Sequence, residues 1–198
     1  MLNQIISGST KIKMQFINFL RQKKSLENNS MTIEHIESGT SFPVKIGILT
    51  FTKSTNFESI NPGAGFQFDY ATENNDKVSI YAYTLGENAI NSIEHPSFVH
   101  ARILSIYELH KNANEHGKAA LQIHSDIIAI PKKNGSIEIA HDIFLIQNDR
   151  SEPTYSEIIN WVAKNHFFKI RLTLNERTPE VSTPFRESLL EIVHISTR

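Results

Sequence analysis

The sequence predicts an α/β/α sandwich in which helices cover a largely antiparallel sheet of about six or seven strands. Two kinds of pattern predict this fold class. Apolar residues alternate with polar ones in several short runs, which is typical of half-buried strands. Two longer segments carry apolar residues at helical spacing instead, and a helix with one apolar stripe must cover the face of a sheet.

The composition is that of one globular domain. Of the 198 residues, 39% are hydrophobic and 21% are charged, close to the averages of globular proteins. The formal net charge is −1, which gives no overall attraction to nucleic acid, and no nucleic-acid partner is predicted. The absence of cysteine excludes disulfides, thiolate metal sites and a cysteine nucleophile.

Residues 1–30 form a basic segment in front of the domain, with five basic residues and one acidic residue. A short helix is predicted over 11–21 and a polar linker over 25–30. The apolar stripe of this helix consists of Ile12, Phe16, Phe19 and Leu20. Packing on the domain is one interpretation, and a weak contact with a membrane surface through residues 11–24 is another.

The single sandwich domain is predicted to span residues 31–198. Met31 is either the start of translation in place of Met1 or the first residue of the folded body. The apolar stretch 14–20 is interrupted by polar residues, and no cleavage pattern of small residues follows it. A cytoplasmic location is therefore expected, and export to the periplasm or beyond stays open.

The first strands of the domain follow. The run 45–53 is rich in β-branched and aromatic residues, and a turn is predicted at 61–63. Apolar residues alternate over 66–70 and again over 78–83, with the polar run 73–76 between them. These two runs predict a hairpin.

The main helix is predicted over 97–115. Pro96 suits the first turn of a helix, and Gly117 is a natural end. One apolar stripe of this helix is expected to cover the sheet, and its residues are Val99, Ile103, Ile106, Tyr107 and His110.

A long hairpin is predicted next, because Asn134-Gly135 lies between the β-rich runs 121–130 and 136–147. Both runs are apolar on both faces, so both strands are expected to be central in a covered sheet. Residues 154–163 fit two structures. Thr154 and Glu157 match a capping box, which favours a helix, whereas the run of Ile, Trp and Val favours a strand.

The strand is the interpretation adopted for 154–163, with a turn into the alternating run 168–174. The last helix is predicted to begin at Pro184. Its apolar stripe consists of Phe185, Leu189, Ile192 and Val193.

The order of these segments resembles a known fold family. The segments 62–70 (PGAGFQFDY), 78–83 (VSIYAY) and 167–173 (FFKIRLT) are similar to those of uncharacterised bacterial proteins, often exported or lipid-anchored, of the Mog1/PsbP-like type. The resemblance covers roughly residues 42–195 and implies an α/β/α sandwich that serves as a binding or scaffold module. Unlike lipid-anchored members, the chain has no cysteine for lipid attachment.

One group of side chains is a candidate binding site. If Asn134-Gly135 is a two-residue turn, His124, Asp126 and His141 lie on one face of the hairpin, with Asp126 diagonal to His141. A carboxylate within reach of an imidazole can bind a ligand or act as an acid–base pair, and it can equally be a structural pair. The nine histidines show no metal-binding spacing, and no metal, cofactor or catalytic residue is predicted.

Two further groups have open interpretations. Lys169 and Arg171 share one face of their strand, where they can grip an acidic partner or simply keep the strand soluble. Tyr81, Tyr83 and Trp161 can line a ligand groove or belong to the core.

The sequence contains no nucleophile elbow, phosphate loop or dinucleotide-binding motif. The predicted function is therefore a non-catalytic domain that binds another protein or a small ligand of unknown specificity. Two alternatives stay open. One is a small metal-assisted hydrolase that uses His124, Asp126 and His141, and the other is a membrane-surface adaptor that uses the basic N-terminal helix.

Overall fold

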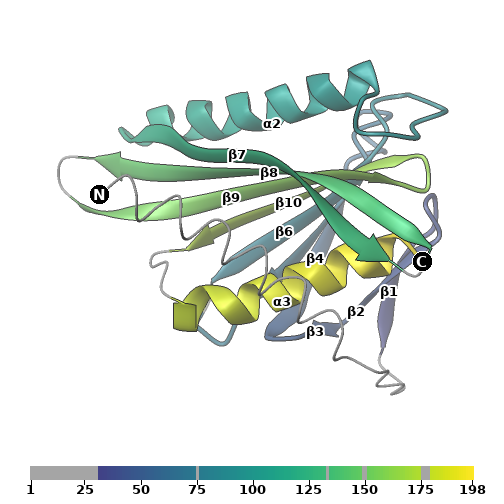
Figure 1. Cartoon of the computed structure of the whole chain (residues 1–198), viewed down its shortest axis with the longest axis horizontal. Helices are drawn as coiled ribbons and strands as arrows, with labels where there is room; N and C mark the ends of the chain where they lie inside the picture. The colour runs from purple at the N-terminus through teal and green to yellow at the C-terminus, as the bar shows by residue number, and fades with distance from the viewer. Residues whose placement is uncertain (1–30, 75, 133, 149–150, 175–178) are drawn as a thin grey trace.

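The computed structural model describes residues 31–74, 76–132, 134–148, 151–174 and 179–198. The helix predicted over 11–21 and the linker over 25–30 lie outside these residues. The described chain forms an eight-stranded sheet, a separate two-stranded hairpin and two helices. Figure 1 shows the sheet between the helices α2 (Pro96–Glu115) and α3 (Pro179–Ser196).

Every neighbouring pair in the large sheet is antiparallel. Its strands, in spatial order, are β3 (Lys45–Ile46), β4 (Leu49–Asn56), β5 (Phe66–Ala71), β6 (Lys77–Tyr83), β10 (His166–Leu174), β9 (Ser151–Ala163), β8 (Gly135–Asn148) and β7 (Ala119–Lys132). The hairpin pairs β1 (Thr32–His35) with β2 (Thr40–Pro43). The chain thus forms two meanders joined by α2, and the second meander runs back until β10 lies beside β6.

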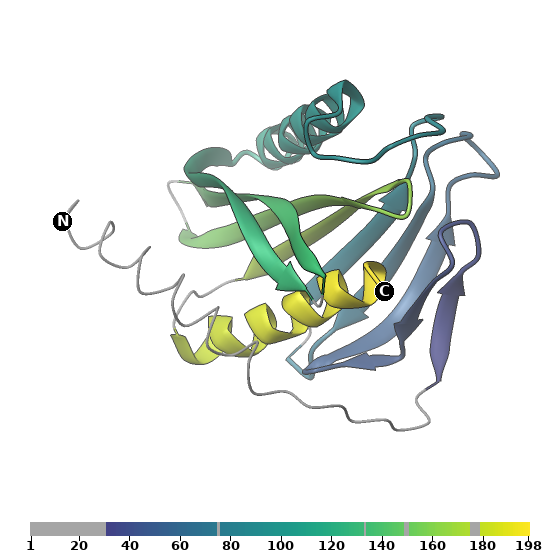
Figure 2. The same ribbon diagram turned by 45° about the vertical axis from the view of Figure 1, so that its right-hand side comes forward.

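The prediction of an α/β/α sandwich is wrong. The structure is mostly β, with 51% strand and 22% helix. Eight strands at their usual spacing span about 34 Å, whereas one helix is about 10 Å wide, so a single helix cannot form a covering layer. Figure 2 shows α2 and α3 on opposite faces of a curved sheet, and each covers only part of its face.

The largest core lies between α3 and the sheet. Trp161 stacks on Phe168 with ring centroids 5.4 Å apart, and its indole N–H donates to the Ser196 hydroxyl at 2.8 Å. The predicted α3 stripe is confirmed, because Phe185, Leu189, Ile192 and Val193 are all buried here. The predicted start is wrong, since α3 begins at Pro179 and Pro184 lies inside it. A proline there removes one backbone hydrogen bond, and packing of the apolar stripe offsets that loss.

The segment 154–163 is a strand, as predicted, and so are both halves of the β5–β6 hairpin. The expected central position is wrong for one strand of the long hairpin. β8 lies between β7 and β9, but β7 is the edge of the sheet. Its apolar residues on both faces therefore do not mean burial on both faces, and Leu121, Ile123 and Ile127 are exposed.

α2 forms where predicted, with Pro96 in its first turn and Gly117 just beyond its end. The prediction of which side of α2 is buried is wrong, because Val99, Ile103 and Tyr107 are 49%, 58% and 62% exposed. The buried side instead carries Phe98, Ala101, Ser105, Leu109 and Ala113. Three of these side chains are small, so the helix backbone can approach the sheet closely.

Candidate functional site

The structure brings the predicted hairpin residues together, in a register different from the expected one. Gly135 already pairs with Lys132, so Asp126 lies directly opposite His141 and not diagonal to it. The same register places His124 opposite Ile143, and the bulge between Gln122 and His124 shifts the pairing only beyond this position. The rings of His124 and His141 are 5.9 Å apart at their centroids, in an edge-to-face arrangement.

The decisive partner of His141 is a residue that the sequence analysis missed. Glu157 on β9 is buried, and its Oε2 lies 2.9 Å from Nε2 of His141. Its backbone pairs with Ile143, so the carboxylate reaches His141 diagonally across the strands. The register between β8 and β9 decides this contact, and no motif in the sequence predicts that register.

These side chains do not form a metal site. Within the described ranges, no three His, Asp or Glu side chains are placed to hold a metal ion together. The hydrolase alternative therefore has no metal centre among these residues. The adaptor alternative depends on residues 11–24, which lie outside the described ranges. None of the described helices is both long and apolar enough to cross a membrane.

On the opposite face of the sheet, a buried ion pair attaches α2 to the hairpin. Asp142 on β8 has no exposed surface. The Nε and Nη2 atoms of Arg102 donate to its two oxygens at 2.8 and 2.6 Å, and Gln122 Nε2 donates to one of them at 2.9 Å. Arg102 also donates to the Ser125 hydroxyl at 2.8 Å. This pair sets the rotation of α2 about its axis, since it fixes which side of the helix faces β7.

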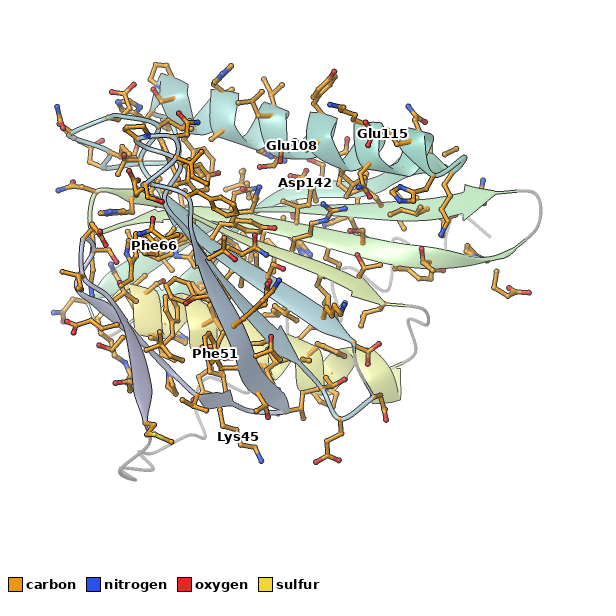
Figure 3. All side chains as sticks on the ribbon, turned by 180° about the vertical axis from the view of Figure 1, so that it is seen from behind. Lys45, Phe51, Phe66, Glu108, Glu115 and Asp142 are labelled. Atoms are coloured by element: carbon orange, nitrogen blue, oxygen red, sulfur yellow. The ribbon has the colours of Figure 1, made fainter. Side chains whose placement is uncertain are left out.

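The same face continues beyond α2 over strands that neither of the two described helices covers (Figure 3). Figure 3 shows this side, with Glu108 on α2 and open strands below the helix. Six polar side chains there form two rows across β5, β6 and β10. We call them the open polar array: the first row is Gln67, Tyr81 and Lys169, and the second is Asp69, Ser79 and Arg171. All six are half-buried.

Asp69, the anion of the array, already has hydrogen-bond and ionic partners. Gln67 Nε2 and the Ser79 hydroxyl donate to Oδ1 of Asp69 at 2.7 and 2.6 Å. Nζ of Lys53, on β4, lies 3.7 Å from the other oxygen of Asp69. The carboxylate therefore has little capacity left to neutralise the cations of the next strand.

The cations of the array are less well compensated. The Lys169 side chain is only 13% exposed and lies 3.6 Å from the well-exposed carboxylate of Glu108. Its ammonium also lies 4.3 Å from the ring centroid of Tyr81. Burial lowers the pKa of Lys169, and Glu108 opposes this shift. Arg171 has no carboxylate within ion-pair distance in the described part of the chain.

The three aromatic candidates for a ligand groove lie in three different places. Tyr81 belongs to the open polar array, and burial raises the pKa of its hydroxyl. Tyr83 packs under α2 with Phe98 and Phe167, so it belongs to a core cluster. Trp161 is fully buried on the α3 face. A groove lined by all three is therefore not formed, and Tyr83 and Trp161 belong to the core, which was the other interpretation.

A buried amide adjoins the array. Asn160 on β9 pairs across the strands with Lys169, and its side chain is 2% exposed. Neither its oxygen nor its nitrogen has a hydrogen-bond partner among the described residues. Such a group is a place where water or a ligand atom is needed.

Comparison with known proteins adds no identification. No family model matches the chain, and no curated protein matches it. The family suggested by the Mog1/PsbP-like resemblance stays a prediction, whereas the α/β/α sandwich that it implies is not the fold of the described chain.

Proposed function

We propose that this protein is a non-catalytic binding domain that holds a carboxylate-rich segment of another protein on the open polar array. The observation that carries the proposal is the surplus of positive charge there. Lys169 and Arg171 stand two residues apart on β10. Among the described residues, one carboxylate forms an ion pair with either of them, and it is that of the exposed Glu108. A bound carboxylate would complete the charge balance.

The array also supplies neutral donors. The pKa of the Tyr81 hydroxyl is raised, so this group keeps its proton at neutral pH and can donate a hydrogen bond. Its ring and the stem of Lys169 provide an apolar floor on which a peptide can lie. These properties suit holding a partner. The Asp69 carboxylate that accepts from the Ser79 hydroxyl also accepts from Gln67 and lies 3.7 Å from Nζ of Lys53, so it is a weak base for activating that hydroxyl.

The test uses a fluorescently labelled oligoglutamate peptide and the full chain. We expect salt-dependent binding in fluorescence anisotropy and a loss of about tenfold in affinity for Arg171→Gln. Lys45→Gln is the matched control, since Lys45 is exposed on the distant strand β3. Equal affinities for the two variants, or no binding by the unchanged chain at about 1 mM peptide, would overturn the proposal.

A further inference from the structure

The two edges of the large sheet are built differently. One edge, β3, is two residues long, so it offers almost no backbone for pairing. The other edge, β7, is 14 residues long and pairs only with β8 among the described strands. Unpaired N–H and C=O groups along a long edge strand are a template for another strand, and natural sheets usually shorten or charge such edges.

The flank of α2 beside this edge is apolar. Arg102 points from α2 to Ser125 on β7, which identifies the flank that faces the edge. Val99 and Ile106 lie three residues before and four residues after Arg102, and Ile103 follows Val99 by one turn. These three residues therefore lie on or beside that flank.

β7 adds exposed aliphatic side chains to this flank. Ile127 pairs with Ala140, which packs under α2, so Ile127 lies on the α2 side of the strand and is 42% exposed. Ile123 has no partner on β8, because the bulge skips it, and it is exposed too. We call these five residues the edge surface: Val99, Ile103, Ile106, Ile123 and Ile127.

The edge surface carries no charge of its own. Between Ala119 and Pro131, β7 contains one charged residue, Asp126, which pairs with His141 on the other face of the strand. The charge of Arg102 is held by Asp142. The central part of two such surfaces can meet without bringing like charges together, and the lysines at the two ends of the strand, Lys118 and Lys132, lie at the ends of the pairing.

We propose that the edge surface binds a second copy of this chain, with the two β7 strands pairing antiparallel about a two-fold axis. Such pairing continues the antiparallel order of the sheet across the dimer, and both α2 helices then lie on the same face with their apolar flanks adjacent. The edge is about 48 Å long and about 10 Å thick, and the helix flank is about 30 Å long. Together they offer on the order of 800 Å² per copy, which is the size of a standard interface.

The test is sedimentation equilibrium of the full chain, combined with hydrogen exchange. We expect a dimer whose β7 amides exchange more slowly as protein concentration rises. Ile103→Glu with Ile127→Glu should weaken dimerisation at least tenfold, whereas Ile60→Glu, in the exposed loop before β5, should leave it unchanged. Circular dichroism checks that the variants fold.

Three outcomes would overturn this inference. A monomer at about 100 μM with fast-exchanging β7 amides would show that the edge stays free. A monomer with slowly exchanging β7 amides would mean that another part of the chain covers the edge. A dimer that the double substitution leaves intact would place the interface elsewhere.

Discussion

Replacing Arg102 with methionine tests how strongly α2 depends on its ion pair with Asp142. Methionine keeps much of the unbranched stem of arginine and removes the guanidinium, which makes two hydrogen bonds to Asp142 and one to Ser125. Asp142 is then a fully buried carboxylate whose remaining side-chain donor is Gln122. Water can replace the lost donors only in part, because α2 covers most of this part of the sheet.

Removing one partner of a buried ion pair costs about 3–5 kcal/mol of unfolding free energy. The Arg102 side chain is 23% exposed, so some water can reach its place. We therefore expect Arg102→Met to lose about 3 kcal/mol of unfolding free energy, the low end of this range. For a chain of this length that loss lowers Tm by roughly 6–12 °C. The double substitution Arg102→Met with Asp142→Leu should recover most of the loss, since no charge then stays buried.

Urea denaturation followed by circular dichroism measures these free energies. Lys111→Met is the matched control, because Lys111 makes an exposed ion pair with Glu115 at 3.9 Å on the same helix. We expect this control to lose less than about 0.5 kcal/mol. A loss below about 1 kcal/mol for Arg102→Met would refute the reasoning, and so would a double variant less stable than Arg102→Met alone.

Two further predictions concern the strands before α2. Burial lowers the pKa of His35 to about 4, so the unfolded chain binds more protons than the folded one between pH 6.5 and 4. We expect His35 alone to contribute roughly 3 kcal/mol to the fall in unfolding free energy over this window as pH decreases, and a His35→Gln variant that keeps the same slope would contradict this. Gly65 has φ +70°, and an added Cβ would collide with the Ala82 carbonyl oxygen, so Gly65→Ala should cost at least about 3 kcal/mol. Gly86→Ala, at φ +79° with open space around its Cβ, should cost only about 1 kcal/mol; similar Tm losses for the two would refute the steric argument.

The open polar array was only partly predictable. Alternation in the sequence placed Lys169 and Arg171 on one face of β10 and suggested a grip on an acidic partner. It did not show that Tyr81 lies opposite Lys169, because β6 and β10 are separated by more than 80 residues of chain and their pairing depends on the whole second meander. The same limit explains why the contact of Glu157 with His141 was not predicted, since this contact depends on the register between β8 and β9.

Local patterns were sufficient wherever a segment's own residues decide its conformation. The alternating runs became strands, Pro96 and Gly117 bounded α2, and the apolar stripe of α3 entered the core. Long-range contacts decided the rest. α2 carries apolar residues on two sides, and close approach through Ala101 and Ser105, together with the Arg102–Asp142 pair, selected which side faces the sheet. The position of β7 at the edge likewise follows from strand order, which no single segment encodes, and it leaves aliphatic side chains exposed where their pattern predicted burial.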